Sequence, residues 1–209
     1  MVLPVMLLLF ACKQLPWKAT VGLLLSAVML GALAWSFAPK VQGNIINVLS
    51  EVRTFQSDGA RTRAGERLEF WRKSVGFIAD APLIGHGTGS IRDQFRRPVD
   101  GQTGMAALAA ANPHNQTLAV AIQLGLVGTA VLFAMWLAHV MLFRGEGFVA
   151  WAGLAIVTQN IVGSLFNAHL FDFTQGGGYV MGVGVAAGAI FKHAASRQSV
   201  QPSEARSLR

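Results

Sequence analysis

The chain has 209 residues, of which 53% are hydrophobic and 13% charged, and its formal net charge is +7. Soluble domains carry about a quarter charged residues, so the composition excludes an ordinary soluble enzyme and indicates an integral membrane protein. The positive charge does not indicate a nucleic-acid-binding protein, because the basic residues are scattered and no aromatic-laced nucleic-acid module accompanies them.

Uncharged apolar runs of membrane-spanning length occur four times. A helix of at least about 18 such residues crosses the roughly 30 Å hydrocarbon core of a bilayer. The predicted spans are residues 19–38, 115–143, 148–171 and 173–191. Residues 1–12 are also uncharged but few, and they lack the basic start of a signal peptide, so we interpret them as a partial or weak span. The sequence therefore predicts the C-terminal part of a larger protein.

Basic residues beside the spans predict the orientation, because Lys and Arg in short flanking loops stay in the cytoplasm. Lys13 and Lys18 precede the first complete span, Arg144 follows the second and Lys192 follows the fourth. The expected fold is an all-α polytopic helical bundle with a long periplasmic loop. Its regions are residues 1–38 with a partial span and one transmembrane helix, 39–114 as the periplasmic loop, 115–193 as three transmembrane helices, and 194–209 as a disordered cytoplasmic tail.

Within the loop, residues 65–79 have helical spacing. Apolar residues recur there at steps of three or four and form one stripe, which consists of Leu68, Trp71, Val75 and Ile78. The pattern predicts an amphipathic helix that lies on the membrane or against the bundle. Pro82 stops this helix, and glycines at 85, 87 and 89 predict a tight exposed turn. Residues 98–111, rich in Gly, Ala and Gln, predict a mobile loop or a short weak helix.

The most informative short motif lies where the loop meets the second long span. Pro113 has a backbone angle suited to a helix start, and Asn112 is expected to cap the free N–H groups there. His114 is then expected in the first helical turn, at the water interface. The structural interpretation of His114 is a helix-starting residue that only forms a hydrogen bond at the interface.

Five segments follow one another in a characteristic order. They are 67–71 (Arg-Leu-Glu-Phe-Trp), 82–90 (Pro-Leu-Ile-Gly-His-Gly-Thr-Gly-Ser), 112–116 (Asn-Pro-His-Asn-Gln), 123–128 (Gln-Leu-Gly-Leu-Val-Gly) and 164–167 (Ser-Leu-Phe-Asn) with Phe171 and Asp172. Together they resemble the O-antigen ligases and the related O-antigen polymerases of bacterial envelopes, over residues 61–189.

The resemblance implies a metal-independent glycosyltransferase of the membrane-embedded (C-type) class in the bacterial inner membrane. Such enzymes move a glycan from undecaprenyl diphosphate to a sugar hydroxyl of the lipid A core at the periplasmic face. The resemblance assigns the acceptor base to His114 and diphosphate binding to Arg67, with Arg63 and Arg61 as nearby alternatives. It implies membrane lipids as further partners and no nucleic acid. Full-length members carry more spans before this region.

The chemistry of these residue types agrees. Imidazole titrates near neutrality and is suited to take a hydroxyl proton. The planar guanidinium of arginine binds phosphate oxygens in pairs and stays charged as a diphosphate departs. The chain has no Asp-x-Asp pair and no His and carboxylate cluster at ligand spacing, so the sequence predicts neither a metal site nor a cofactor.

Other polar residues have both a functional and a structural interpretation. Possible supporting residues are Asn115, Arg72, His169 and Asp172. The structural alternatives are pairing of Arg67 with Glu66 or Glu69, headgroup contacts of Arg72 and Lys73, and turn stabilisation by His169 and Asp172. A structural role is favoured for His86, and His139 is expected at the membrane interface near the cytoplasm. Helix packing is the favoured role of Gln159, Asn160, Asn167 and glycines 176, 177, 178, 182, 184 and 188.

Three rival functions remain open. Polymerisation of O-antigen or another surface polysaccharide differs from ligation in the acceptor, as does protein O-glycosylation by an oligosaccharyltransferase. A transporter fragment is a rival from another class, and it predicts functional polar residues deep within the spans.

Overall fold

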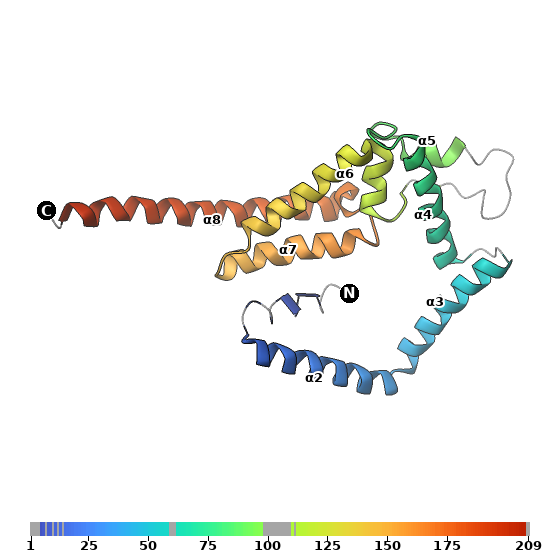
Figure 1. Cartoon of the computed structure of the whole chain (residues 1–209), viewed down its shortest axis with the longest axis horizontal. Helices are drawn as coiled ribbons and strands as arrows, with labels where there is room; N and C mark the ends of the chain where they lie inside the picture. The colour runs from blue at the N-terminus through green and yellow to red at the C-terminus, as the bar shows by residue number, and fades with distance from the viewer. Residues whose placement is uncertain are drawn as a thin grey trace.

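The computed structural model describes residues 5–6, 8–9, 11, 13, 15–58, 62–97, 110 and 112–207. Within them the regular secondary structure is helical (Figure 1). The elements are α2 (Trp17–Ser36), α3 (Pro39–Asp58), α4 (Arg63–Asp80), α5 (Ile91–Arg96), α6 (Gln116–Leu142), α7 (Phe148–Ser164), the 3₁₀ helix η3 (His169–Phe171) and α8 (Phe173–Ser207).

Helices α6, α7 and α8 pack side by side into a bundle (Figure 1). Its apolar core contains Trp136, Phe143 and Val157. Two hydrogen bonds join the helices inside this core: the Trp136 indole N–H donates to Asn160 Oδ1 at 3.0 Å, and His139 Nδ1 lies 2.7 Å from the Tyr179 hydroxyl. The interpretation of Asn160 as a helix-packing residue is confirmed.

One helix of the described chain, α6, is long and apolar enough to cross a membrane, where four spans were predicted. Residues 17–33 of α2 and the whole of α7 are apolar but shorter. Helix α7 ends at Ser164 rather than near residue 171, because the chain there turns back through η3. Helix α8 continues to Ser207, so the expected disordered tail is helical, as propagation needs only one hydrogen bond per added residue.

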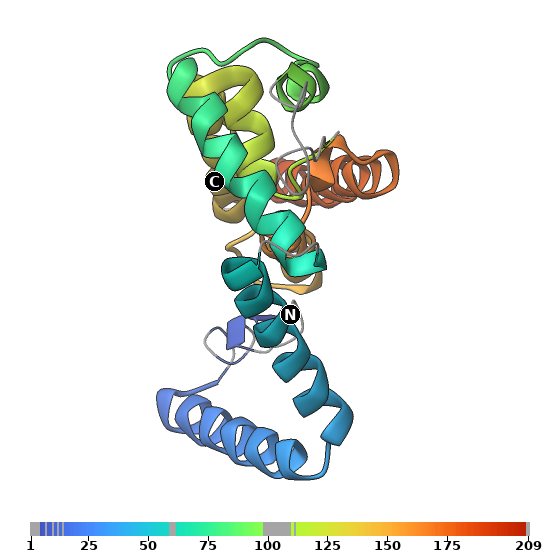
Figure 2. The same ribbon diagram turned by 90° about the vertical axis from the view of Figure 1, so that its right-hand side faces the viewer.

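The expected 39–114 loop is largely helical. Helix α3 connects α2 to α4, and α2 and α3 stand apart from the bundle (Figure 2). The apolar residues Val41, Ile45, Val48 and Val52 recur at steps of three or four, a helical period that the sequence analysis missed. Arg61 and most of residues 98–111 lie outside the described residues.

The predicted amphipathic helix exists as α4, but its buried face differs from the predicted stripe. Val75 of that stripe is 61% exposed, whereas Phe70 is buried against Phe95 and Ile122. Gly65 is also buried, because α3 crosses there and a Cβ would lie 2.7 Å from the ring of Phe55. Helix crossing, which a count of apolar residues cannot capture, therefore decides the buried face.

A buried carboxylate lies on the same face of α4. Glu69 is 5% exposed, and its two oxygens accept hydrogen bonds from Arg72 Nε and Nη2 at 2.8 and 2.7 Å. This hydrogen-bonded pair lowers the pKa of Glu69 and raises that of Arg72, outweighing the opposing effect of burial. Arg72 therefore balances a charge that α4 itself buries.

The glycine turn after α4 fits into a break in α6. Gly125, with φ 61°, interrupts α6, and the helix bends there (Figure 1). The N–H groups of Leu126 and Val127 donate to the carbonyls of Pro82 and Leu83 at 2.8 and 3.2 Å. The turn's own N–H groups at residues 86 and 87 donate to the carbonyls of residues 122 and 123, both at 2.9 Å. The second predicted span is therefore not one continuous helix.

Only glycine fits at two positions of this junction. A Cβ on Gly85 would lie 2.4 Å from the Gln123 carbonyl carbon, and a Cβ on Gly125 would lie 2.4 Å from the Leu83 carbonyl. Both residues also have positive φ, as do Gly87 and Gly89, which confirms the predicted turn. Six glycines of α8 were expected to allow close helix packing. A Cβ on Gly176 or Gly182 would meet a neighbouring atom, but glycines 177, 178, 184 and 188 face open space, so the expectation is wrong for these four.

Alanine substitution tests the junction. Gly85→Ala and Gly125→Ala combine a disfavoured backbone angle with overlap against fixed backbone, so each is expected to destabilise the protein by about 1–3 kcal/mol more than Gly87→Ala. Gly87 is the matched control, since its φ is 93° but nothing lies within 4 Å of its Cβ position. Thermal inactivation of the detergent-solubilised variants measures the difference. Equal losses for all three variants would contradict the interlocked junction.

The buried carboxylate predicts a pH dependence of stability. Because folding lowers the pKa of Glu69, its contribution is present above the ordinary value of 4.5 and is lost as the pH falls through the folded-state pKa. Unfolding midpoints of the wild-type protein should fall more steeply below pH 4.5 than those of Glu69→Gln. Glu146→Gln, in an exposed turn, is the control and should keep the wild-type slope. Parallel curves for Glu69→Gln and wild type would refute the assignment.

Candidate functional site

The loop that carries His114 precedes α6 instead of forming its first turn. His114 has φ 54°, and its N–H donates to the Asn112 side-chain oxygen at 2.8 Å. Asn115 caps α6, because its side-chain oxygen accepts the N–H of Leu118 at 3.0 Å. The expected helix start at Pro113 with an Asn112 cap is therefore wrong: Asn112 closes a local turn that displaces the helix start to Gln116.

Helix α4 holds one side of this loop. The Trp71 indole N–H donates to the carbonyl of Pro113 at 3.1 Å, and Pro113 is fully buried. The ring of Phe70 lies 6.4 Å from the imidazole of His114, tilted by 35°. The two aromatic residues therefore fix both the backbone before His114 and one flank of its ring.

The turn between α7 and α8 holds the other side. Asn115 Nδ2 donates to the carbonyl of Leu165 at 3.1 Å, and the N–H of Leu170 donates to Gln116 Oε1 at 2.8 Å. Asn167 Oδ1 lies 3.4 Å from His114 Nδ1 and 3.4 Å from Asn112 Nδ2. Residues far apart in the sequence thus meet around a half-buried imidazole.

The Asn167 contact fits one of the two neutral tautomers of the His114 ring. An amide oxygen only accepts, so the tautomer that fits this contact carries its proton on Nδ1 and its lone pair on Nε2. Among the described residues, Nε2 of His114 has no hydrogen-bond partner. Nε2 is therefore the ring nitrogen that stays open to a ligand.

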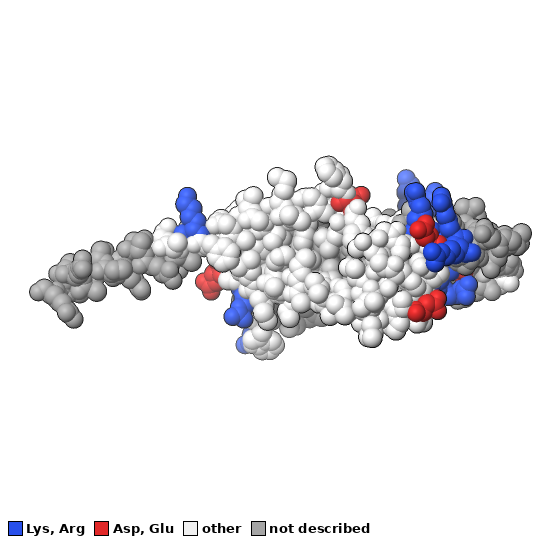
Figure 3. All heavy atoms as spheres, turned by 90° about the horizontal axis from the view of Figure 1, so that it is seen from above, with Lys and Arg blue, Asp and Glu red and all other residues white. Residues whose placement is uncertain are grey.

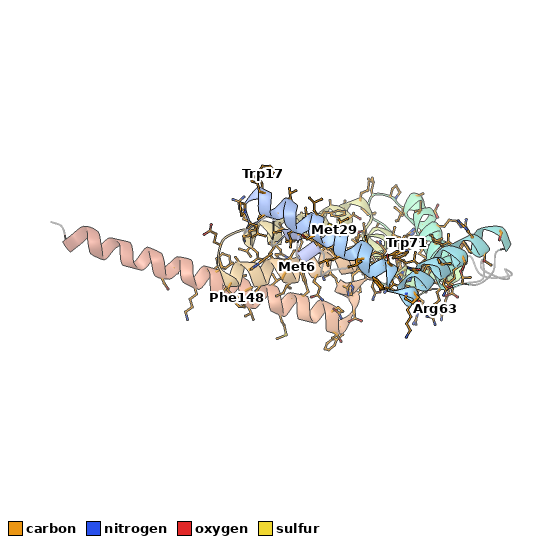
Figure 4. All side chains as sticks on the ribbon, turned by 90° about the horizontal axis from the view of Figure 1, so that it is seen from below. Met6, Trp17, Met29, Arg63, Trp71 and Phe148 are labelled. Atoms are coloured by element: carbon orange, nitrogen blue, oxygen red, sulfur yellow. The ribbon has the colours of Figure 1, made fainter. Side chains whose placement is uncertain are left out.

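Arg63 and Arg67 lie at four-residue intervals before Trp71, on the helix face that contacts Pro113. Both are exposed, and Arg63 points away from the helices (Figure 4). Lys and Arg residues gather over α4 and α5 at this end of the molecule (Figure 3). Arg72 differs from the other two arginines because Glu69 binds it in a bidentate pair, and Glu69 therefore does not pair with Arg67.

The remaining candidates are placed elsewhere. Asp172 accepts the N–H groups of Thr174 and Gln175 at 3.0 and 2.9 Å and so caps α8. His169 packs against Gly163 of α7, and within the described part of the chain no hydrogen bond joins His169 or Asp172 to His114. His86 Nε2 lies 2.7 Å from the carbonyl of Phe77 at the end of α4, a structural contact. These side chains stabilise turns and helix ends.

Sequence reasoning missed the residues that position His114. Asn167 was assigned to helix packing, although it lies beyond the end of α7 and contacts the imidazole. Phe70 and Trp71 belong to the segment 67–71, but Trp71 was expected only in the apolar stripe of the amphipathic helix, and neither was expected to contact the loop of His114. The four-residue spacing from Arg67 to Trp71 was a usable signal, because it places both on one helix face.

Comparison with known proteins adds a family match. A family model described as O-antigen ligase matches residues 1–133. That range contains the first four of the five resembling segments, while the segment at residues 164–172 lies beyond it.

An uncharacterized protein of Haemophilus influenzae is 27% identical to the chain over 142 residues. The alignment covers 66% of the chain and 35% of that relative, so the chain spans about a third of the relative's length. Since the family model matches more than half of the chain, from its first residue through most of α6, this protein belongs to the O-antigen ligase family.

Proposed function

We propose that this protein transfers a lipid-linked glycan to a sugar hydroxyl, with His114 as the base. The glycan donor is an undecaprenyl diphosphate glycan, and the acceptor is a sugar of the lipid A core. The supporting observation is the hydrogen bond between Nδ1 of His114 and Asn167, which leaves Nε2 available. A loop fixed from both sides keeps this nitrogen in one orientation, as a positioned base requires.

The proposed reaction has one displacement. The acceptor hydroxyl gives its proton to Nε2 of His114, and its oxygen forms a bond to the anomeric carbon of the donor sugar. The bond between that carbon and the diphosphate oxygen breaks, and undecaprenyl diphosphate leaves with the electron pair. The imidazolium then releases its proton to water.

Arginine side chains are proposed to stabilise the leaving group. Arg67 is the main candidate and Arg63 the second, since both are exposed and share the α4 face with Trp71. A guanidinium binds phosphate oxygens in pairs without a proton transfer, so no step requires a metal. Arg72 is less suited, because Glu69 already accepts hydrogen bonds from its Nε and Nη2 and balances its charge.

The charge distribution supports a bundle that crosses the inner membrane. Basic residues lie on both sides of a mostly uncharged zone of the bundle (Figure 3). Lys13 binds the Gly145 carbonyl, which brings Lys13 and Arg144 to the same end of the bundle. This end is proposed to be cytoplasmic and the end with His114 periplasmic.

Replacement of His114 tests the base. His114→Ala should lower glycan transfer by about 10²- to 10⁴-fold at unchanged membrane abundance, because the hydroxyl proton loses its acceptor. His139→Gln, at the other end of α6, is the control. The measurement is a lipopolysaccharide gel from cells lacking the chromosomal gene and supplied with each variant. Undiminished transfer by His114→Ala would exclude the proposed base.

The same gel distinguishes ligation from polymerisation. Loss of a ligase leaves polymer on its lipid carrier and bare core on the gel, whereas loss of a polymerase leaves core with a single repeat. The second pattern would retain the chemistry proposed for His114 and replace the acceptor.

Asn167 is proposed to position the imidazole, and a charge substitution tests this role. In Asn167→Asp, a carboxylate next to Nδ1 stabilises the protonated ring, so the acidic limb of the pH–rate profile should move to higher pH. Asn167→Leu should lower the rate without this movement. An unchanged acidic limb in Asn167→Asp would show that residue 167 does not contact the base during transfer.

A further inference from the structure

A second polar site lies beside the one that carries His114. Helices α7 and α8 enclose a half-open cavity of about 450 Å³ next to η3. The polar residues that line it are Gln159, Asn160, His169, Thr174, Gln175 and Tyr179. None of them takes part in the proposed proton transfer, so that step assigns no role to the cavity.

The described lining can form hydrogen bonds but contains no Lys, Arg, Asp or Glu. Three side chains at the opening, Gln159, Thr174 and Gln175, form no side-chain hydrogen bond within the described part of the chain. Asn160 uses its oxygen for Trp136 and keeps its amide N–H groups. Together these groups offer both donors and acceptors to a ligand.

This chemistry selects the ligand class. The described residues that line the cavity include no Lys or Arg, which disfavours a phosphate or a lipid headgroup, and one imidazole without a carboxylate is a poor metal site. A neutral sugar presents a ring of hydroxyls that both donate and accept, which matches side-chain amides and hydroxyls. The volume lies within the roughly 300–1,000 Å³ of small-molecule pockets.

The cavity is joined to the first site by a short turn. Asn167 contacts the imidazole of His114, and His169, two residues later, lines the cavity. We propose that this cavity is a subsite for a neutral sugar unit of the glycan handled at His114. The assignment of that glycan rests on the proposed function, but binding of a sugar in the cavity does not require transfer.

Gly178 allows a test by filling the space. Gly178 lines the cavity, and a Cβ there meets nothing within 4 Å, so Gly178→Leu should occupy the cavity without disturbing the fold. Gly177 is the matched control, since it precedes Gly178 on α8, also faces open space, and does not line the cavity.

The experiment measures binding of D-glucose, D-galactose and N-acetyl-D-glucosamine by saturation-transfer NMR to the full chain in lipid nanodiscs. At least one sugar should bind, and Gly178→Leu should weaken that binding by about tenfold or more, equivalent to about 1.4 kcal/mol. Gly177→Leu should bind like wild type. Absence of binding by all three sugars, or equal binding by both leucine variants, would overturn the proposal.

The His114→Ala variant separates the two hypotheses. It should keep sugar binding in the cavity while it loses transfer. If it transfers normally and still binds sugar, the proposed base fails and the cavity assignment stands. If it loses transfer and sugar binding is absent from every variant, the base stands and the cavity assignment fails.

Discussion

Four backbone hydrogen bonds join the glycine turn, residues 82–87, to the break in α6 and so hold α4 next to α6. In an unbroken helix, the N–H groups of residues 126 and 127 would donate to the carbonyls of 122 and 123. Here both pairs separate, and each of the four groups finds a partner in residues 82–87 instead. Breaking the helix therefore leaves none of these groups unsatisfied, which is a strict requirement in an apolar environment.

This junction determines where the site can form. It fixes α4 against the first half of α6, because the turn follows α4 directly and its His86 contacts the Phe77 carbonyl. With α4 in place, Trp71 reaches Pro113 and Phe70 reaches His114. The turn after α7 then closes the site through Asn167. The imidazole is thus positioned by contacts among three segments, each of which is short and weak alone.

The charges near the site have separate structural and chemical uses. Glu69 is buried, so it requires a fixed cation, and Arg72 supplies it in a bidentate pair. Arg63 and Arg67 stay exposed on the face that adjoins the loop, where a ligand anion can reach them. The described lining of the cavity between α7 and α8 has no Lys, Arg, Asp or Glu, in contrast to this basic end, and the contrast agrees with the separate contacts proposed for diphosphate and sugar.

The sequence by itself determined the helical class, α4, the glycine turn with its positive φ angles, and the family, because apolar runs, helical spacing and ordered short segments are local properties. It identified His114 as the candidate base but not its setting. Only the tertiary structure decided that Gly125 breaks α6, that the helix starts after His114, and that Asn167 contacts the imidazole. The break in α6 and the Asn167 contact depend on hydrogen bonds between residues 36 to 53 positions apart, and no local pattern specifies which distant groups will meet.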